Sequence, residues 1–357
     1  MERLALRSGL VPRPAAEAYG GLALAGVLIA AVELGIPARL ERGPVTLAAL
    51  ADGLAPDAVE LLVECLVSAG YLHRTGDVVA LTVQGRRWLA PRGSHSMAAF
   101  VAACADYGPW WSRLADVVRT GRPVGHHEAA PDDAYWRRYE LGQRDLARLS
   151  ADEVARHIRL GRGPRRVLDI GGGHGSYTIA LCRGNPGLRA TVLDLPGAVA
   201  VGTEVVTAAG LAERIDFRTG DAREVDFGTG YDAVLCFNLI HHLDPAEIVR
   251  LFRRAAGALA PGGRLHVLDG FAPSGGPHTA RRNRPGGRGR DPAAAYTALF
   301  MYLTSGSRLH THEEMRGFLA SSGLHRVSSR AIRRMPGLSL YSAMARPSAL
   351  LGDAGAS

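Results

Sequence analysis

The residues from Val167 to Leu181 (VLDIGGGHGSYTIAL) are typical of a ligand-binding turn between a buried strand and a helix. Glycines are needed where the backbone passes close to a ligand, because a side chain there would clash. Asp169 stands two residues before the first glycine, where its carboxylate can accept hydrogen bonds from a cationic amino group. A dinucleotide-binding strand normally has an apolar residue there, and Ser176 replaces the third glycine of that fingerprint. The turn therefore favours a nucleotide-like ligand with a cationic amino acid group and argues against a nicotinamide-dependent oxidoreductase.

Two further acids follow the next two predicted strands. Asp194 lies at the end of the run ATVLDL, where a carboxylate can bind ribose hydroxyls. Asp221 follows the run RIDFRTG, where it can accept from an adenine amino group. Each acid alone could be a helix cap. Because the carboxyl ends of parallel strands meet at one edge of a sheet, acids at three successive strand ends indicate a single binding site.

The candidate for proton transfer is the pair His241 and His242, just after the fourth predicted strand and at the start of a helix. An imidazole at the sheet edge that carries Asp169 and Asp194 could remove a proton from a hydroxyl group of a second ligand, the acceptor of a transferred group. Adjacent helical residues point about 100° apart, so we do not expect both rings to face the acceptor equally. Helix capping or core packing of the pair is the alternative.

The elements that must position these residues alternate between strand-like and helical runs from Arg165 onward. The alternation predicts a parallel sheet wrapped by helices. The last two strand-like runs are joined by a short segment without a helix and predict a terminal antiparallel hairpin. The strand-like runs are RRVLDI, ATVLDL, RIDFRTGD, YDAVLCFNL, GRLHVLDG, GLHRVSSRAI and LSLYSAMA.

The residues from Ala30 to Leu89 follow a different pattern, in which three helices precede a hairpin. This order is that of a winged helix. Thr46 and Asp57 stand where two of the helices should begin, and Gly76–Asp77 marks the turn between two short strands.

A winged helix and a formal net charge of +8 raise the question of nucleic acid binding. The exposed face of the third predicted helix carries Asp57, Glu60 and Glu64 and no basic residue, and such a face would repel phosphates. The densest basic run, Arg281–Arg290, is broken by proline and glycine and is interpreted as a solvated loop. We therefore expect no nucleic acid partner, and a packing or dimerisation role for the winged helix.

Composition sets the broad class of the protein. The chain has 357 residues, of which 47% are hydrophobic, so we expect a large core and two domains. Its four cysteines match no zinc or dense disulfide spacing, which predicts reduced thiols in a cytoplasmic protein. The segment Gly21–Leu34 is strongly apolar but short for a bilayer, and it contains Glu33. We expect it to form a helix buried in an interface, with no membrane partner.

Aromatic residues gather in the helical part between Ala98 and Leu149. They could line an acceptor site or belong to the core, and the sequence favours neither. Ala272–Pro292, rich in glycine and proline, is either a mobile lid near the mouth of the site or a disordered loop. The candidate substrate-binding residues are Tyr107, Trp111 and Tyr302.

Taken together, the segments LDIGGGHG, LDLPGAV, GDA and IHHLDPAEIVRLFRRAAGALAPGGRLHVLD resemble the motifs of class I S-adenosylmethionine (SAM)-dependent methyltransferases. With the winged helix in front, the chain is similar to small-molecule O-methyltransferases of the acetylserotonin and caffeate type, from about Ala30 to Arg346. The resemblance implies an α/β fold, in which a mostly α-helical winged-helix dimerisation domain precedes a Rossmann-like seven-stranded methyltransferase domain. It also implies SAM as cofactor and a homodimer formed through the N-terminal domain.

On this basis we predict four segments. Residues 1–97 form the N-terminal winged-helix and dimerisation domain, and residues 98–160 form a helical linker that contributes to the substrate site. Residues 161–347 form the SAM-binding methyltransferase domain, and residues 348–357 form a disordered tail.

The resemblance also implies roles for single residues. His241 takes the place of the family's catalytic histidine, and His242 stands where that segment has an aspartate. Asp269, at the end of the fifth predicted strand, corresponds to the acid that orients the histidine. We therefore expect these three residues in the catalytic site, with His241 as general base. The expected cofactor-binding residues are Asp169, Gly171, Gly173, Gly175, Asp194, Leu195, Asp221, Ala222 and Asn238.

The chain departs from this family at a later glutamate, which has no counterpart in Ser307–Thr311 (SRLHT). This segment and the altered histidine pair are similar to relatives that methylate carbon or nitrogen, some of them with a bound metal. Adjacent or alternating histidines are more often ordinary polar residues, so we expect no metal. The histidines that could supply metal ligands are His241, His242, His310 and His312.

The sequence thus predicts a SAM-dependent methyltransferase of secondary metabolism, of the kind used in antibiotic biosynthesis. We expect a small aromatic or polyketide-like acceptor, with oxygen ahead of carbon or nitrogen as the methylated atom. The alternative from another class is a regulator that binds SAM without catalysis.

Overall fold

The computed structural model describes residues 12–125, 133–158, 160, 165–272 and 292–345. The chain divides into two compact units, residues 1–108 with 141–146 and residues 109–140 with 147–357. The predicted tail 348–357 and the basic run Arg281–Arg290 lie outside the described residues, as does the insert Ala272–Pro292 apart from its two ends.

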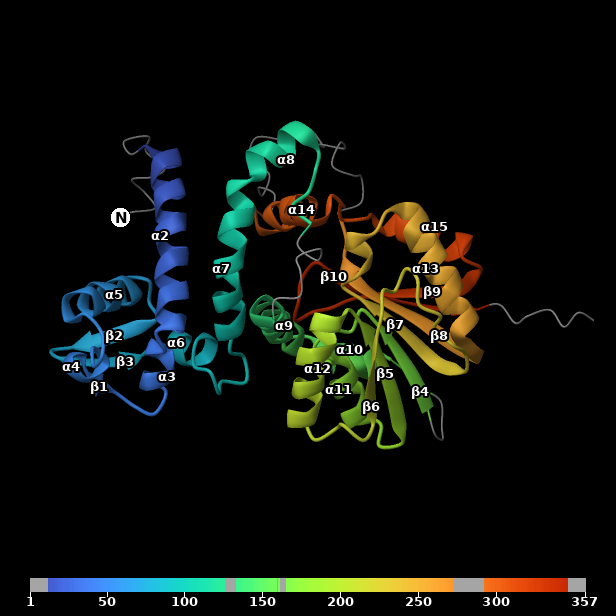
Figure 1. Cartoon of the computed structure of the whole chain (residues 1–357), viewed down its shortest axis with the longest axis horizontal. Helices are drawn as coiled ribbons and strands as arrows, with labels where there is room; N and C mark the ends of the chain where they lie inside the picture. Colours follow the sequence, from blue (N-terminus) through green and yellow to red (C-terminus); the bar gives the residue numbers. More distant parts are fainter. Residues whose placement is uncertain (1–11, 126–132, 159, 161–164, 273–291, 346–357) are drawn as a thin grey trace, which may run out of the picture. The chain divides into compact units, whose positions relative to one another are not determined.

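The amino-terminal unit has the predicted order of helices followed by a hairpin (Figure 1). Thr46 caps the third helix of the unit, because its hydroxyl accepts from the backbone N–H of Ala49 at 3.2 Å. Asp57 lies in the first turn of the next helix, whose N-cap is Ala55 and has no side-chain cap. The elements are α2 (Arg13–Glu33), α3 (Ile36–Leu40), β1 (Val45–Thr46), α4 (Leu47–Leu50), α5 (Pro56–Ser68), β2 (Leu72–Thr75), β3 (Val78–Leu81), α6 (Val83–Trp88) and α7 (Ala98–Ser112), and the three strands pair in the order β1-β3-β2.

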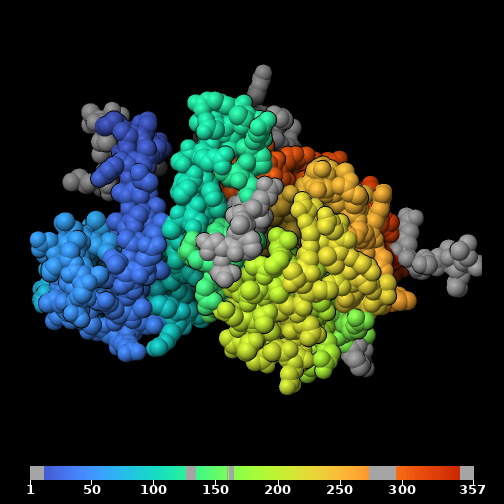
Figure 2. Space-filling view, in the orientation of Figure 1, coloured from blue at the N-terminus to red at the C-terminus, as the bar shows by residue number. Residues whose placement is uncertain are grey.

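Helix α2 is exposed along most of its length within its unit. Leu22 is 77% exposed, whereas Val27, Leu28 and Ala31 pack on the core of the unit. Figure 2 shows the first turns of α2, in dark blue, projecting from the winged helix. By length and composition alone α2 could cross a membrane, but core helices and signal sequences meet the same criteria. An apolar surface of this kind is usually covered by another protein or by a membrane.

The carboxyl-terminal unit is built on a seven-stranded sheet of order β6-β5-β4-β7-β8-β10-β9. The pairs from β6 to β8 are parallel, whereas β10 pairs antiparallel with both β8 and β9. The predicted parallel sheet and the predicted terminal hairpin are therefore both confirmed. The strands are β4 (Arg165–Ile170), β5 (Leu188–Asp194), β6 (Ile215–Thr219), β7 (Tyr231–Phe237), β8 (Leu259–Gly270), β9 (Leu324–Ala331) and β10 (Leu338–Ala345).

Helices cover both faces of this sheet, and the alternation along β4 decides which way each side chain points. Leu168 packs in the cluster that contains α13 (Pro245–Ala258) and α15 (His312–Ser321). Val167 packs in the opposite cluster, with α10 (Ala151–His157), α11 (Ser176–Gly184) and α12 (Pro196–Ala208). Asp169 has the parity of Val167, so its side chain faces α11 at the carboxyl end of the strand.

The terminal hairpin is held from both sides of the sheet. Glu153 on α10 accepts from the backbone N–H groups of Arg333 and Arg334, at 2.9 and 3.1 Å. Tyr341 on β10 is fully buried, and its hydroxyl lies 2.6 Å from Nδ1 of His312 on α15. Strand β10, the last described element, is thereby fixed between two strands that precede it in the chain.

Candidate active site

The turn between β4 and α11 lies directly on a buried carboxylate. A Cβ atom at Gly172 would lie 2.6 Å from Cγ of Asp169, so only glycine allows this approach. Asp169 is 1% exposed, and its Oδ2 accepts from the Thr178 hydroxyl on α11 at 2.5 Å. Its Oδ1 is buried and accepts no hydrogen bond from any described residue. A buried carboxylate oxygen without a donor fits a ligand that supplies a cationic N–H group.

The pKa of Asp169 is raised to about 6, mainly by burial, with the Thr178 hydroxyl lowering it and the Asp194 carboxylate raising it. Burial and a neighbouring carboxylate both disfavour the ionised acid, whereas the hydrogen bond from Thr178 favours it. A positively charged ligand would lower the pKa of Asp169 again, because an opposite charge favours the ionised acid.

Asp194, at the end of β5, is attached to the same turn by backbone hydrogen bonds. Its Oδ2 accepts from the N–H of Gly173 and its Oδ1 from the N–H of Leu195, both at 2.7 Å. Gly173 has a φ of 47°, a left-handed conformation that favours glycine. Burial raises the pKa of Asp194 to about 6, although both backbone N–H groups lower it. The carboxylate is therefore fixed in orientation and keeps lone pairs for ligand hydroxyls.

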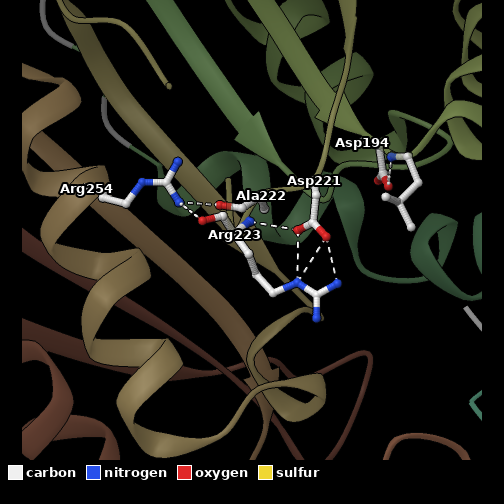
Figure 3. Close-up of polar contacts among 6 residues, drawn as sticks. Asp194, Asp221, Ala222, Arg223 and Arg254 are labelled. Atoms are coloured by element: carbon white, nitrogen blue, oxygen red, sulfur yellow. Dashed lines mark hydrogen bonds and ion pairs between the residues drawn. The ribbon is translucent and has the colours of Figure 1, made fainter. Parts of the chain in front are cut away.

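Asp221, after β6, is engaged by a side chain instead (Figure 3). Its Oδ2 accepts from Nη2 of Arg223 at 2.6 Å, and its Oδ1 accepts from the Arg223 backbone N–H at 2.8 Å. The hydrogen bonds from Arg223 lower the pKa of the acid below its usual value. An adenine amino group at Asp221, as the sequence predicts, would have to share this carboxylate with Arg223.

Arg254 on α13 fixes the loop that carries Asp221 (Figure 3). Its Nη1 donates to the carbonyl oxygens of Ala222 and Arg223, at 2.6 and 2.8 Å. Its Nη2 donates to the carbonyl of Val225, and its Cζ lies 4.3 Å from the centroid of the Phe227 ring. Ala222, a predicted cofactor-binding residue, is thus positioned by an arginine that the sequence analysis missed. The residues between them give no local signal, because the contact exists only once α13 packs on the sheet.

The loop after β7 lies against the glycine turn. A Cβ atom at Gly171 would lie 3.2 Å from Cδ2 of Leu239. Asn238 has a φ of 51°, and its backbone N–H donates to the carbonyl of Leu268 at 2.7 Å. Its side chain hydrogen-bonds to the hydroxyl of Tyr177 on α11. The predicted residues Gly171 and Asn238 therefore lie in two adjoining loops at the same sheet edge.

His241 and His242 lie in the 3₁₀ turn η1 (Ile240–His242), which precedes α13. Nδ1 of His241 is 2.8 Å from Oδ1 of Asp269, and both residues are buried. The same Oδ1 accepts from the N–H of Gly270 at 2.8 Å. A carboxylate partner assigns the proton to Nδ1, so Nε2 is the ring nitrogen that can accept a proton.

The two imidazole rings touch each other, with centroids 4.1 Å apart and planes inclined by 53°. The pair lies in a 3₁₀ turn, in which adjacent residues are about 120° apart, and the prediction that the two rings do not face the acceptor equally stays a prediction. His241 is buried against its carboxylate, whereas His242 is half-buried. The structure thus brings His241, His242 and Asp269 together.

Glu140, on α9 (Asp133–Arg148), is a third acid at the glycine turn that the sequence analysis missed. It is 4% exposed, and a Cβ atom at Gly173 would lie 2.5 Å from its Oε2. The backbone N–H of His174 donates to its carboxylate. Burial first, and then Asp194, raise the pKa of Glu140 well above its usual value. No motif marks this residue, since α9 is far from the turn in the sequence.

Aromatic side chains meet where α7 ends and where α14 (Pro292–Ser305) packs. Phe300 on α14 contacts Trp110 and Trp111, with ring centroids 6.1 and 5.8 Å apart. Tyr302, on the same helix, is 37% exposed, and Trp111 is 36% exposed. The structure therefore brings two of the three predicted substrate residues to one helix pair, together with Phe300, which the sequence analysis missed. Tyr107 belongs to the amino-terminal unit, where its hydroxyl bonds to the side chain of Gln143.

Helix α14 ends against the histidine turn. The hydroxyl of Ser305 donates to the carbonyl of His241 at 3.5 Å, and that of Ser307 donates to the carbonyl of Leu243 at 3.3 Å. The helix that carries Phe300 and Tyr302 is therefore attached to the turn that carries the candidate base.

His310 is buried in the second unit, whereas His312 is half-buried. The His310 ring packs edge-on against Phe318, with centroids 5.2 Å apart, and its burial lowers the pKa of the imidazole. His312 lies against Tyr341, as described above. Within the part of the chain that the structure describes, no group of three or more His, Cys, Asp or Glu side chains could hold a metal ion.

Comparison with known proteins adds to this geometry. A family model described as a methyltransferase domain matches residues 167–263. The 3-hydroxy-5-methyl-1-naphthoate 3-O-methyltransferase of Streptomyces sahachiroi is 30% identical, over 70% of this chain and 74% of that protein. The mitomycin biosynthesis 6-O-methyltransferase of Streptomyces lavendulae is 32% identical, over 67% of this chain and 72% of that protein.

Related chains also differ in the reaction that they are named for. An aclacinomycin 10-hydroxylase of Streptomyces purpurascens is 30% identical, over 87% of this chain and 84% of that protein. Among solved structures, human N-acetylserotonin methyltransferase in complex with SAM superposes with a TM-score of 0.77 at 20% identity, over 93% of this chain and 97% of that chain. The fold is thus shared with that enzyme, and the reaction has to be argued from the site.

Proposed function

Since this chain belongs to the class I SAM-dependent O-methyltransferase family, we propose that it methylates a hydroxyl group of a small aromatic or polyketide-like natural product. The observation that carries this proposal is the buried pair of His241 and Asp269, 2.8 Å apart, at the sheet edge that also holds Asp169 and Asp194. The aromatic side chains of Trp111, Phe300 and Tyr302 support a flat, apolar acceptor.

The residues at the sheet edge fit SAM. The free Oδ1 of Asp169 suits the cationic amino group of its amino acid moiety, and the fixed carboxylate of Asp194 suits the ribose hydroxyls. When bound, SAM supplies an electrophilic methyl group on a sulfonium. Residues of the adjoining loops would complete the site, namely Gly171, Gly173, Gly175, Leu195, Asp221, Ala222 and Asn238.

The protein's own contribution to the reaction is to orient the acceptor and to take its proton. Nε2 of His241 would accept the proton of the acceptor hydroxyl. Asp269 holds the ring through Nδ1 and stabilises the imidazolium that forms. His242, in ring contact with His241, limits the rotation of that ring. Positioning supplies most of the rate enhancement, since methyl transfer is an in-line displacement.

We also propose that the protein is a cytoplasmic homodimer that forms through its N-terminal domain. Helix α2 has an exposed apolar surface that includes Leu22, and such a surface is usually buried in an interface. The α2 helix of a second copy is equally apolar and could pack against it. Its partners would then include no nucleic acid and no membrane. Glu60 and Glu64 on α5 are both bound by Arg74, at 2.8 and 2.9 Å, which leaves the helix face acidic or neutral. Analytical ultracentrifugation should give a dimer for the native protein and a monomer for Leu22→Glu.

A second candidate is methyl transfer to carbon or nitrogen. It is favoured by the segment Ser307–Thr311, which contains no acid; Glu314, three residues further on, accepts from Arg308 and from the backbone N–H of Thr311. A regulator that binds SAM without turnover would not need a general base, so the buried histidine–carboxylate pair of His241 and Asp269 argues against it.

The proposal is tested by incubation with methyl-labelled SAM and a panel of hydroxylated naphthoates, phenols and aminophenols. We expect label on oxygen in the native protein, and loss of turnover with unchanged SAM affinity in His241→Gln. Label on carbon or nitrogen would establish the second candidate, and tight SAM binding without turnover on any acceptor would favour the regulator.

A further inference from the structure

Three carboxyl groups lie around the glycine turn at Gly172 and Gly173. The Asp169 carboxyl lies under Gly172, the Asp194 carboxyl accepts from the N–H of Gly173, and the Glu140 carboxyl lies against the Cα of Gly173. They come from β4, β5 and α9. Asp169 and Asp194 are accounted for by the amino group and the ribose of SAM, whereas Glu140 is not.

The donors at this turn are too few for three ionised acids. Gly173 and Leu195 donate to Asp194, Thr178 donates to Asp169, and His174 donates its backbone N–H to Glu140. Like charges in a site of low dielectric constant cannot all be ionised, so at least one acid must hold a proton when no cation is present. Glu140 is the best candidate, because it receives one backbone donor and faces the Asp194 carboxylate.

We propose, as a consequence of the proposed function, that Glu140 is a third cofactor-binding carboxyl group, protonated in the free enzyme, which releases its proton to solvent when the positively charged SAM binds. The balance is one proton lost from the carboxylic acid and one carboxylate formed beside the bound cation. SAM affinity should then rise with pH, by at most about tenfold per pH unit for each proton released.

The other charged groups near Glu140 do not remove the effect. Asp194 and Asp169 are acids and add to the repulsion. The imidazole of His174 lies at the start of α11, where its Nδ1 accepts from the N–H of Ser176 at 3.1 Å. Arg137, on the same helix as Glu140, is held by Glu204 of α12 at 2.5 Å. In the part of the chain that the structure describes, these contacts bring no cation to the Glu140 carboxyl.

The test is isothermal titration of SAM into the native protein and into Glu140→Gln, between pH 6.5 and 8.5. At each pH, two buffers of different ionisation enthalpy give the number of protons released. We expect native protein to release close to one more proton than Glu140→Gln at pH 6.5. The native protein should bind SAM more tightly than Glu140→Gln, and its advantage should grow between pH 6.5 and 8.5 by at most about tenfold per pH unit, since only it gains a carboxylate.

Glutamine keeps an oxygen that can accept from His174, so Glu140→Gln removes the charge and leaves the hydrogen bond. The matched control is Glu204→Gln, which removes an exposed carboxylate that faces α9 from outside. It should leave both the proton count and the SAM affinity unchanged.

Equal proton counts and equal pH profiles for native protein and Glu140→Gln would overturn the inference. If Glu140→Gln does not fold, the native protein decides alone, because a proton count near zero at pH 7.5 also overturns it. Absence of SAM binding by the native protein would instead overturn the proposed function, so the two failures are distinguishable.

Discussion

The proposed cofactor end and the proposed acceptor end of the site are held in different ways. At the cofactor end, Asp194 is fixed by two backbone N–H groups, and the turn beside it leaves no room for a side chain at Gly172 or Gly173. At the acceptor end, Phe300 and Trp111 meet through ring faces and lie on helices instead of strand ends. Backbone geometry determines the first end, and the choice of side chains determines the second.

This difference explains how one fold serves many acceptors. Replacing a ring on α14 leaves the sheet untouched, whereas moving Asp194 would disturb the turn that we propose binds SAM. The two Streptomyces O-methyltransferases similar to this chain are named for unlike acceptors, a naphthoate and a mitomycin precursor. The junction between the ends is the histidine turn, to which α14 is attached through Ser305.

The largest effect should come from that junction. Asp269→Asn removes the carboxylate that assigns the proton of His241 to Nδ1, so we expect kcat to fall by about 10²-fold or more with the SAM Kd unchanged. Steady-state kinetics and titration of SAM on the same samples measure the two quantities. Asp232→Asn, at the amino end of β7, is the control for loss of an aspartate. If Asp269→Asn also weakened SAM binding, the cofactor end and the acceptor end would not be independent of each other.

The next effect should be confined to the cofactor end. Asp194→Asn keeps one acceptor oxygen but removes the charge, and we expect SAM affinity to fall by about 1–3 kcal/mol. The companion variant Asp221→Asn should lose less, because Arg223 already engages that carboxylate. Equal losses would show that Asp221 contacts the cofactor as closely as Asp194 does.

Stability should respond to pH in the sense opposite to that of an acid held in an ion pair. Folding raises the pKa values of Asp169 and Asp194 to about 6, so these acids favour the folded state below their unfolded pKa values and oppose it as pH rises through 6. Bound SAM should offset the repulsion between the ionised acids. The rise in Tm that SAM causes should therefore be larger at pH 7.5 than at pH 5.0, by at least about 2 °C. Calorimetry with and without SAM measures it. A shift independent of pH would contradict the repulsion.

The smallest effect should be at the acceptor end. Phe300→Ala removes the ring between Trp110 and Trp111, and we expect the KM for the acceptor to rise by about 2- to 10-fold with the SAM Kd unchanged. Tyr296→Ala removes an exposed ring from the same helix and is the control. If both variants raise KM equally, α14 acts through its stability and not through Phe300.

The sequence predicted best what depends on neighbouring residues. The runs RRVLDI and LSLYSAMA coincide with β4 and β10, because strand periodicity is local. The glycine turn was marked by its own spacing, and Asp269 by the strand that it ends. Glu140, Arg254 and Phe300 were missed, since each reaches the site only through packing between elements far apart in the chain. The pairing of Asp221 with Arg223 was within reach, because two residues of opposite charge stand two positions apart.

The position of β10 has a consequence for synthesis on the ribosome. Because β10 inserts between β8 and β9, the sheet cannot close until residues 338–345 have left the exit tunnel. Until then β8 and β9 present unpaired edges, which in a nascent chain invite chaperones or aggregation. A nonsense mutation or a proteolytic cut before Leu338 would therefore leave residues 165–270 able to form the parallel strands but not a finished sheet. Loss of β10 would thus expose the chain to cellular quality control, although residues 338–345 contain none of the acids or histidines proposed to take part in the reaction.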